Sequence, residues 1–126
     1  MKWLNQIPGH PLPYYTFIAD EREYLALMKR MGVAKPYRWI NEGAHGTTHY
    51  HMYKKLGDIA VVCIDRAWIR TAPLYVLAGL IAHEAWHVWE KYMEMIDERK
   101  PSSEFSAYGM ERIVEELMRE AVRFRK

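Results

Sequence analysis

The sequence of 126 residues predicts one α+β domain, in which a small and mostly antiparallel sheet lies between an N-terminal helix and two C-terminal helices. Two patterns lead to this fold class. Segments rich in β-branched and aromatic residues occupy the middle of the chain, and apolar residues recur at helical spacing before and after them. The length is ordinary for a domain built around one hydrophobic core.

The N-terminal part predicts an arm followed by a helix. Residues 1–18 are rich in proline and aromatic side chains, which favours an extended arm laid over the core. A helix is expected over residues 20–31, because Asp20 and Glu23 form a capping box and apolar residues follow at helical spacing. Gly32 is a typical residue for the end of such a helix.

Three segments are expected to form the sheet. Residues 36–40 predict a short strand, residues 47–53 are rich in β-forming residues, and residues 59–64 are a continuous apolar run typical of a buried strand. Residues 54–58, which include Gly57, predict a hairpin between the last two strands.

The last half of the chain predicts two long helices. Thr71 and Pro73 mark the start of the first, since threonine is a good N-cap and proline is tolerated in the first turn. Residues 98–101 end this helix, and Ser102 caps a final helix that returns along the domain and reaches about Phe124.

The first of these two helices contains an HExxH motif, His83-Glu84-Ala85-Trp86-His87. The two histidines lie one turn apart on one face, so both imidazoles can bind the same metal ion. Glu84 lies about 100° further round the helix, where it can accept a proton from a metal-bound water instead of binding the ion. The alternative is that both histidines are ordinary residues of a half-buried helix, hydrogen-bonded to backbone or carboxylate groups.

A catalytic zinc ion usually has three protein ligands and a water, so the motif needs a third ligand. Glu90 and Glu94 share the face of the histidines, but three side chains of one straight helix diverge along its axis. Glu104, in the first turn of the final helix, is the expected third ligand, because residues 98–103 are long enough to bring the chain back. The alternative is that Glu104 only complements the helix dipole.

The motif and the segment Glu104-Phe105-Ser106-Ala107-Tyr108 together resemble the zincin metallopeptidases, in their glutamate-ligand or gluzincin branch. They are similar to small members with an E-x-x-A pattern on the second helix, such as the ImmA/IrrE-like peptidases of phages and mobile elements. The resemblance covers residues 47–121. One residue departs from the ImmA/IrrE pattern, because Trp86 stands where that pattern usually has glycine.

The resemblance implies a minimal zincin-like domain with a Zn²⁺ cofactor. Its metal ligands would be His83, His87 and Glu104, and Glu84 would be the catalytic base. The chain is also similar to minimal zincins encoded by phages.

Two further groups of residues are candidates for a role. His45, His49 and His51 form a second cluster, and on a strand His49 and His51 face the same side. They stabilise a substrate oxyanion, bind a second metal, or are half-exposed strand residues. Tyr108 lies one turn from Glu104, so its hydroxyl either polarises a scissile carbonyl as a catalytic group or hydrogen-bonds within a packed core.

The expected function is that of a zinc metallopeptidase, a hydrolase in which Glu84 passes the proton of a metal-activated water to the leaving amine. The peptide or protein substrate would pair with an exposed edge strand. The alternative is a zincin-like phage protein with a structural or assembly role and an assembly partner, in which the metal site is structural or vestigial.

Other classes are disfavoured by composition. The net charge of +2 argues against a nucleic-acid partner, including a DNA-tethered peptidase, and the single Cys63 excludes an internal disulfide and a multi-cysteine zinc site. No apolar run is long enough for a membrane helix, and the first residues lack the pattern of a signal peptide. We therefore expect a soluble, cytoplasmic protein, or a virion-associated one if a phage encodes it.

Overall fold

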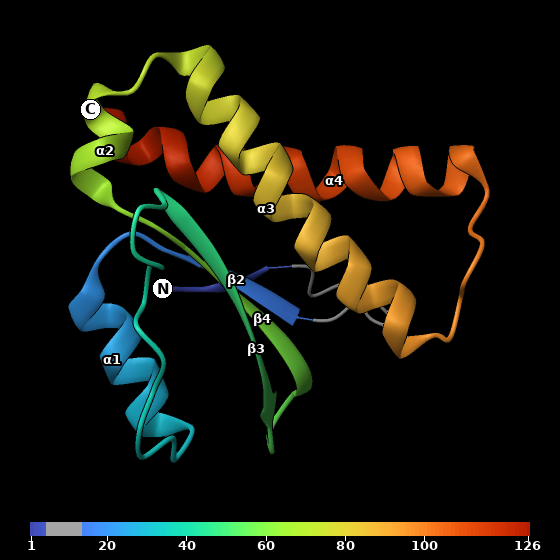
Figure 1. Ribbon diagram of the computed structural model, residues 1–126, viewed down its shortest axis with the longest axis horizontal. Coiled ribbons are helices and arrows are strands. Elements are labelled where there is room, and N and C mark those ends of the chain that lie inside the picture. Colours follow the sequence, from blue (N-terminus) through green and yellow to red (C-terminus); the bar gives the residue numbers. More distant parts are fainter. Residues whose placement is uncertain (5–13) are drawn as a thin grey trace.

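A mixed sheet and four α-helices make up the part of the chain that the computed structural model describes, residues 1–4 and 14–126 (Figure 1). This mixture of helix and sheet is consistent with the predicted α+β class. The elements, in chain order, are β1 (Trp3–Leu4), β2 (Tyr14–Ile18), α1 (Glu21–Arg30), β3 (Gly46–Tyr53), β4 (Gly57–Ile64), α2 (Arg66–Thr71), α3 (Leu74–Met95), α4 (Ser103–Val122) and the 3₁₀ turn η1 (Arg123–Arg125).

The strands lie in the order β1-β2-β4-β3, so β3 is at an edge of the sheet. β3 and β4 form the predicted antiparallel hairpin, with Tyr53 opposite Gly57. β1 also pairs antiparallel with β2, but the central pair β2 and β4 is parallel, with Tyr14 opposite Ile59.

Helices cover both faces of the sheet (Figure 1), and each face has its own apolar cluster. Ile59, Val61 and Cys63 of β4 pack with α1, whereas Ala60 and Val62 pack on the other face with α3 and α4. All five side chains are fully buried. Burial on both faces explains why β4 is a continuous apolar run rather than an alternating one.

The structure differs from two expectations, one about the position of the N-terminal arm and one about a strand. Residues 14–18, assigned to an extended arm over the core, form the buried strand β2 between β1 and β4, whereas residues 5–13 of that arm lie outside the described residues. The strand predicted over residues 36–40 is wrong. Backbone groups of this segment and of the residue after it interact with side chains instead of with a neighbouring strand. His49 Nε2 lies 2.8 Å from the Trp39 carbonyl oxygen, and the Asn41 amide donates to Thr47 Oγ1.

The start of the long helix also differs from the prediction. Thr71 is the last residue of α2, a short helix that the sequence analysis did not find and that Asp65 caps. α3 then begins at Leu74, with Pro73 at its N-cap position. Among the described residues, no helix is both long and apolar enough to cross a lipid bilayer.

α4 packs against α3 through close aromatic contact. A Cβ atom built at Gly109 would overlap the indole ring of Trp89, so only glycine fits at this position of α4. The Phe105 ring lies edge-on to Trp89 and Tyr92, at 5.2 and 6.2 Å between ring centroids. This contact fixes the side of α3 on which α4 lies.

Candidate functional site

The two histidines of the HExxH motif lie side by side on the solvent-facing side of α3. Their ring centroids are 5.1 Å apart, and the side chains of His83 and His87 are 66% and 39% exposed. The spacing of four residues in a regular helix places them on one face, as predicted. Both rings can therefore be reached from solvent by one ligand or ion.

Glu84 lies beside this pair but is buried, with only 2% of the residue exposed. Its Oε1 accepts a hydrogen bond of 2.8 Å from the hydroxyl of Thr48 on β3, and its Oε2 lies 4.0 Å from His83 Nε2. The side chain of Glu84 thus joins α3 to the edge strand. One carboxylate oxygen is fixed by Thr48, and the other lies toward the imidazole.

Glu90 contacts one histidine of the motif. Its Oε1 lies 3.0 Å from His87 Nδ1, one turn away on the same helix. A carboxylate at Nδ1 favours the tautomer that donates to it, which leaves the lone pair of Nε2 free for a metal ion. Glu94 pairs with Lys91, at 3.6 Å between charged atoms.

Tyr50 is a residue of this site that sequence reasoning missed. Its hydroxyl donates a hydrogen bond of 2.8 Å to the backbone carbonyl of His87, which ties β3 to α3. Burial, together with the carboxylates of Glu90, Glu84 and Glu94, raises the pKa of Tyr50 to about 12. Tyr50 is therefore a neutral hydrogen-bond donor at physiological pH.

Glu104 is not brought together with the two histidines. Phe105 packs on Trp89, which lies on the side of α3 away from His83 by the rotation of about 100° per residue. Within residues 1–4 and 14–126, no group of three His, Cys, Asp or Glu side chains is arranged to hold a metal ion. Tyr108 is 67% exposed, so it is not the packed core tyrosine of the alternative interpretation.

His49 and His51 lie on the opposite face of the sheet from the motif. They pair with Val61 and Ile59, which pack with α1, whereas Thr48 lies on the face toward α3. His49 is buried against Tyr24, and burial and the neighbouring His49 lower the pKa of His51. Of the three alternatives for these two histidines, stabilisation of an oxyanion at the motif does not agree with their place on the other face of the sheet.

His45 does lie next to the motif, in a pocket of about 450 Å³ that His83 and Glu84 also line. The His45 ring stacks on Trp68 of α2, with centroids 4.7 Å apart and planes 12° apart. Apolar groups, including Leu80, form most of the remaining wall. Trp68 is not among the residues predicted for the site, because no sequence pattern indicates α2.

Gly79 of α3 forms part of the same pocket, and its missing side chain leaves free space there. A Cβ atom at this position would meet nothing within 4 Å, and its backbone is helical. Neither close packing nor backbone conformation requires glycine here, although glycine in a helix costs about 1 kcal/mol relative to alanine. The free volume over Gly79 is available to a ligand group.

The described side chains therefore offer two exposed imidazoles, a buried carboxylate and an apolar pocket within one region of α3 and β3. Imidazoles can bind a metal ion and a carboxylate can accept a proton, but the described residues supply only two imidazoles and no third ligand. No protein-family model, curated protein or solved structure matches this chain.

Proposed function

We propose that this protein is a zinc-dependent peptidase that hydrolyses peptide bonds at the HExxH motif of α3. The observation that carries the proposal is the arrangement of the motif: both imidazoles are exposed on one face, and Glu84 is buried beside them on a hydrogen bond from Thr48. An ordinary half-buried helix would not require a buried carboxylate next to two accessible histidines.

The donor set fits two of the ligands of a zinc ion. His83 and His87 supply imidazole nitrogens, and the contact of Glu90 with His87 Nδ1 is the outer hydrogen bond typical of zinc-bound histidines. Glu104 remains the proposed third ligand on the strength of the zincin resemblance, because the described arrangement does not supply one. A bound zinc ion supplies Lewis-acid chemistry, which makes a water nucleophilic near neutral pH and polarises a carbonyl.

Glu84 is the proposed general base. The hydroxyl of Thr48 holds Oε1, so Oε2, on the side of His83, is the oxygen that can take a proton from the attacking water. Glu84 then delivers this proton to the nitrogen of the leaving amine. Tyr50 is a positioning residue, because its hydroxyl is occupied by the carbonyl of His87.

The edge strand and the pocket define how a peptide would lie. β3 pairs only with β4 among the described strands, so an extended peptide can add to its other edge through main-chain hydrogen bonds. The pocket of Trp68, Leu80 and Gly79 opens beside His83 and would receive an apolar side chain next to the scissile bond.

Glu84→Gln tests the mechanism. Glutamine keeps the shape and can still accept from Thr48, but it cannot take the proton, so hydrolysis of an unfolded protein substrate should fall by a factor of about 10²–10⁴ with the zinc content unchanged. Glu94→Gln is the matched control, because Glu94 is on the same helix and exposed. Zinc-dependent hydrolysis that survives Glu84→Gln would show that this mechanism is wrong.

The absence of a third ligand from the described arrangement favours a second candidate, a zincin-like structural or assembly protein. In that case Glu84→Gln would leave the biological function intact. If the metal stabilises the fold, His83→Ala would lower the melting temperature in the presence of zinc. If the site is vestigial, neither Glu84→Gln nor His83→Ala would have an effect. Measuring activity and melting temperature on the same two variants separates the candidates.

A further inference from the structure

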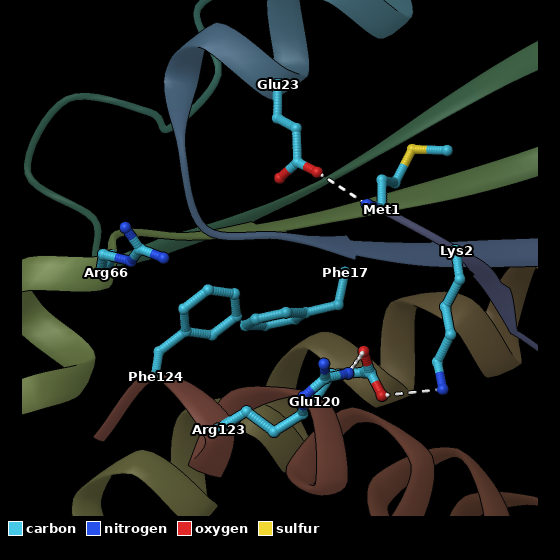
Figure 2. A pocket seen from close by; sticks show the side chains of 8 residues that line it. All are labelled: Met1, Lys2, Phe17, Glu23, Arg66, Glu120, Arg123 and Phe124. Carbon is cyan, nitrogen blue, oxygen red and sulfur yellow. Dashed lines mark hydrogen bonds and ion pairs between the residues drawn. The ribbon is translucent and has the colours of Figure 1, made fainter. Parts of the chain in front are cut away.

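A second pocket, of about 390 Å³, lies apart from the HExxH motif, because no residue of α3 lines it (Figure 2). Its residues come from the two residues before β1 and from β2, α1, α2, α4 and η1. The side chains that determine its chemistry are Lys2, Phe17, Arg66, Glu120, Arg123 and Phe124.

Two phenylalanine rings form the apolar wall of this pocket. Phe17 is buried on β2, and its ring centroid lies 6.0 Å from that of Phe124 on η1. Hydrogen bonds hold η1 in place: Arg125 Nη1 donates to the carbonyls of Ile69 and Ala72, at 2.9 and 2.6 Å. Arg70 Nε in turn donates to the carbonyl of Phe124, at 3.1 Å. The wall is therefore fixed by contacts to α2 and the residue after it.

The charged groups of the pocket leave one basic side chain without a carboxylate. Glu120 is shared by Lys2 and Arg123, at 3.3 and 3.2 Å, and Glu23 pairs with the amino group of Met1, at 2.9 Å (Figure 2). Arg66 forms no ion pair in the part of the chain that the structure describes. The pocket therefore has an excess of positive charge.

Arg66 is held in a position that suits an anion. Its guanidinium carbon lies over the Phe124 ring, 4.9 Å from the ring centroid, so the cationic group is held against the aromatic wall. Because Arg66 has no carboxylate partner among the described residues, its N–H groups are available to a carboxylate or a phosphate, both of which match the guanidinium fork. In the view of Figure 2, Arg66 and Lys2 flank the Phe17 and Phe124 rings.

We infer that this pocket binds a small organic anion, in which a carboxylate or phosphate group is attached to a flat apolar body. The anionic group pairs with Arg66, and the apolar body packs against Phe17 and Phe124. Both parts are needed, because the positive charge and the aromatic wall lie in one pocket. This site is independent of the proposed peptidase activity.

Four probes test the site by titration of the full chain, followed by NMR chemical shifts or calorimetry. Phenyl phosphate and benzoate carry both parts, inorganic phosphate carries only the charge, and benzyl alcohol carries only the ring. We expect at least one aromatic anion to bind about tenfold or more tightly than inorganic phosphate and benzyl alcohol, and the better of the two identifies the anionic group. Equal binding of inorganic phosphate, or no binding of either aromatic anion, would overturn the inference.

Variants locate the binding. Arg66→Gln should weaken the binding of the aromatic anion about tenfold or more, because it removes a charged hydrogen bond. Phe124→Leu should also weaken this binding, because it removes the aromatic ring. Arg119→Gln, on the exposed surface of α4 outside the pocket, makes the same change of charge and should have no effect. Arg66 is exposed, so Arg66→Gln should keep the melting temperature of the wild type. Equal weakening by the Arg66 and Arg119 variants would show general charge attraction and overturn the assignment.

Discussion

The hydrogen bond from Thr48 to Glu84 fixes the proposed base, and Thr48→Val removes it with little change of side-chain shape. The bond is 2.8 Å long, and Glu84 is 2% exposed, so water cannot easily replace the lost donor. The carboxylate is left in the interior with its Oε1 unpaired. The variant should therefore be less stable than the wild type at neutral pH.

The size of the effect follows from the charge of the acceptor. A hydrogen bond to a charged group contributes about 1.5–3 kcal/mol, against about 0.5–1.5 kcal/mol for a neutral pair. For a domain of this length, 1.5–3 kcal/mol corresponds to a fall of roughly 5–15 °C in the melting temperature. In the Glu84→Gln background the same Thr48→Val change should cost about 1 kcal/mol less, because the acceptor is neutral.

Urea unfolding of the wild type, the two single variants and the double variant measures this difference as a coupling free energy. Thr48→Val should also lower kcat more than it raises KM, because the base loses its fixed orientation. A cost below about 0.5 kcal/mol, or equal costs with Glu84 and with glutamine, would refute the reasoning, since the bond would then not bear on a buried charge.

Three further predictions concern positions around the two helices and the edge strand. Gly79→Ala should stabilise the protein by up to about 1 kcal/mol, and Gly109→Ala should destabilise it by about 1–3 kcal/mol, because only position 109 lacks space for a Cβ atom. Melting temperatures that change in the same direction in both variants would contradict this. Gly79→Leu should fill the pocket and lower kcat/KM for substrates with an apolar side chain, and an unchanged substrate profile would show that the pocket is not used. Between pH 10 and about 12, the free energy of unfolding measured in urea should fall less in the Tyr50→Phe variant than in the wild type. The raised pKa of Tyr50 means that its neutral form stabilises the fold below pH 10, and this contribution is lost as pH rises through about 12; identical pH profiles would contradict it.

Elements with their own local signals could be predicted from the sequence. Asp20 caps α1 as expected, since its side chain accepts from the Arg22 amide at 2.7 Å, although Glu23 pairs with the amino group of Met1 instead of completing a capping box. β2 and α2 could not be found in this way. β2 is defined by its parallel pairing with β4, a distant partner that leaves no local pattern, and the six residues of α2 are too few to show helical periodicity.

The candidate site divides along the same line. His83, Glu84 and His87 are placed by the geometry of one helix, which a sequence shows directly. The contacts of Thr48 and Tyr50 depend on the way α3 crosses β3, and no spacing in the sequence contains that information. His49 and His51 of β3 were predicted to share one face, and they do. Only the packed sheet shows that this face is turned away from the motif.

The third ligand is the part of the site on which sequence and structure differ most. The length of the linker shows that Glu104 can return to α3, but the side of α3 is decided by the packing of Trp89 on Gly109. The fully buried residues of α4, namely Ile113, Leu117 and Ala121, all lie in its C-terminal half, and Phe105 near its start is 41% exposed. A shift of its first turn would therefore disturb the contacts of Phe105 with Trp89 and Tyr92, but not these three buried residues.

We expect Glu104→Ala to lower the affinity for zinc by a factor of about 10 or more, as the loss of a ligand would. A catalytic zinc usually has three protein ligands, and Glu90 and Glu94 already have other partners. Glu94→Ala should leave the affinity unchanged, and His87→Ala gives the full loss for comparison. The measurement is a competition titration with a chromophoric chelator. If Glu104→Ala behaves like Glu94→Ala, α4 keeps its packing on Trp89 when metal is present, and two imidazoles alone are too few for the proposed hydrolysis.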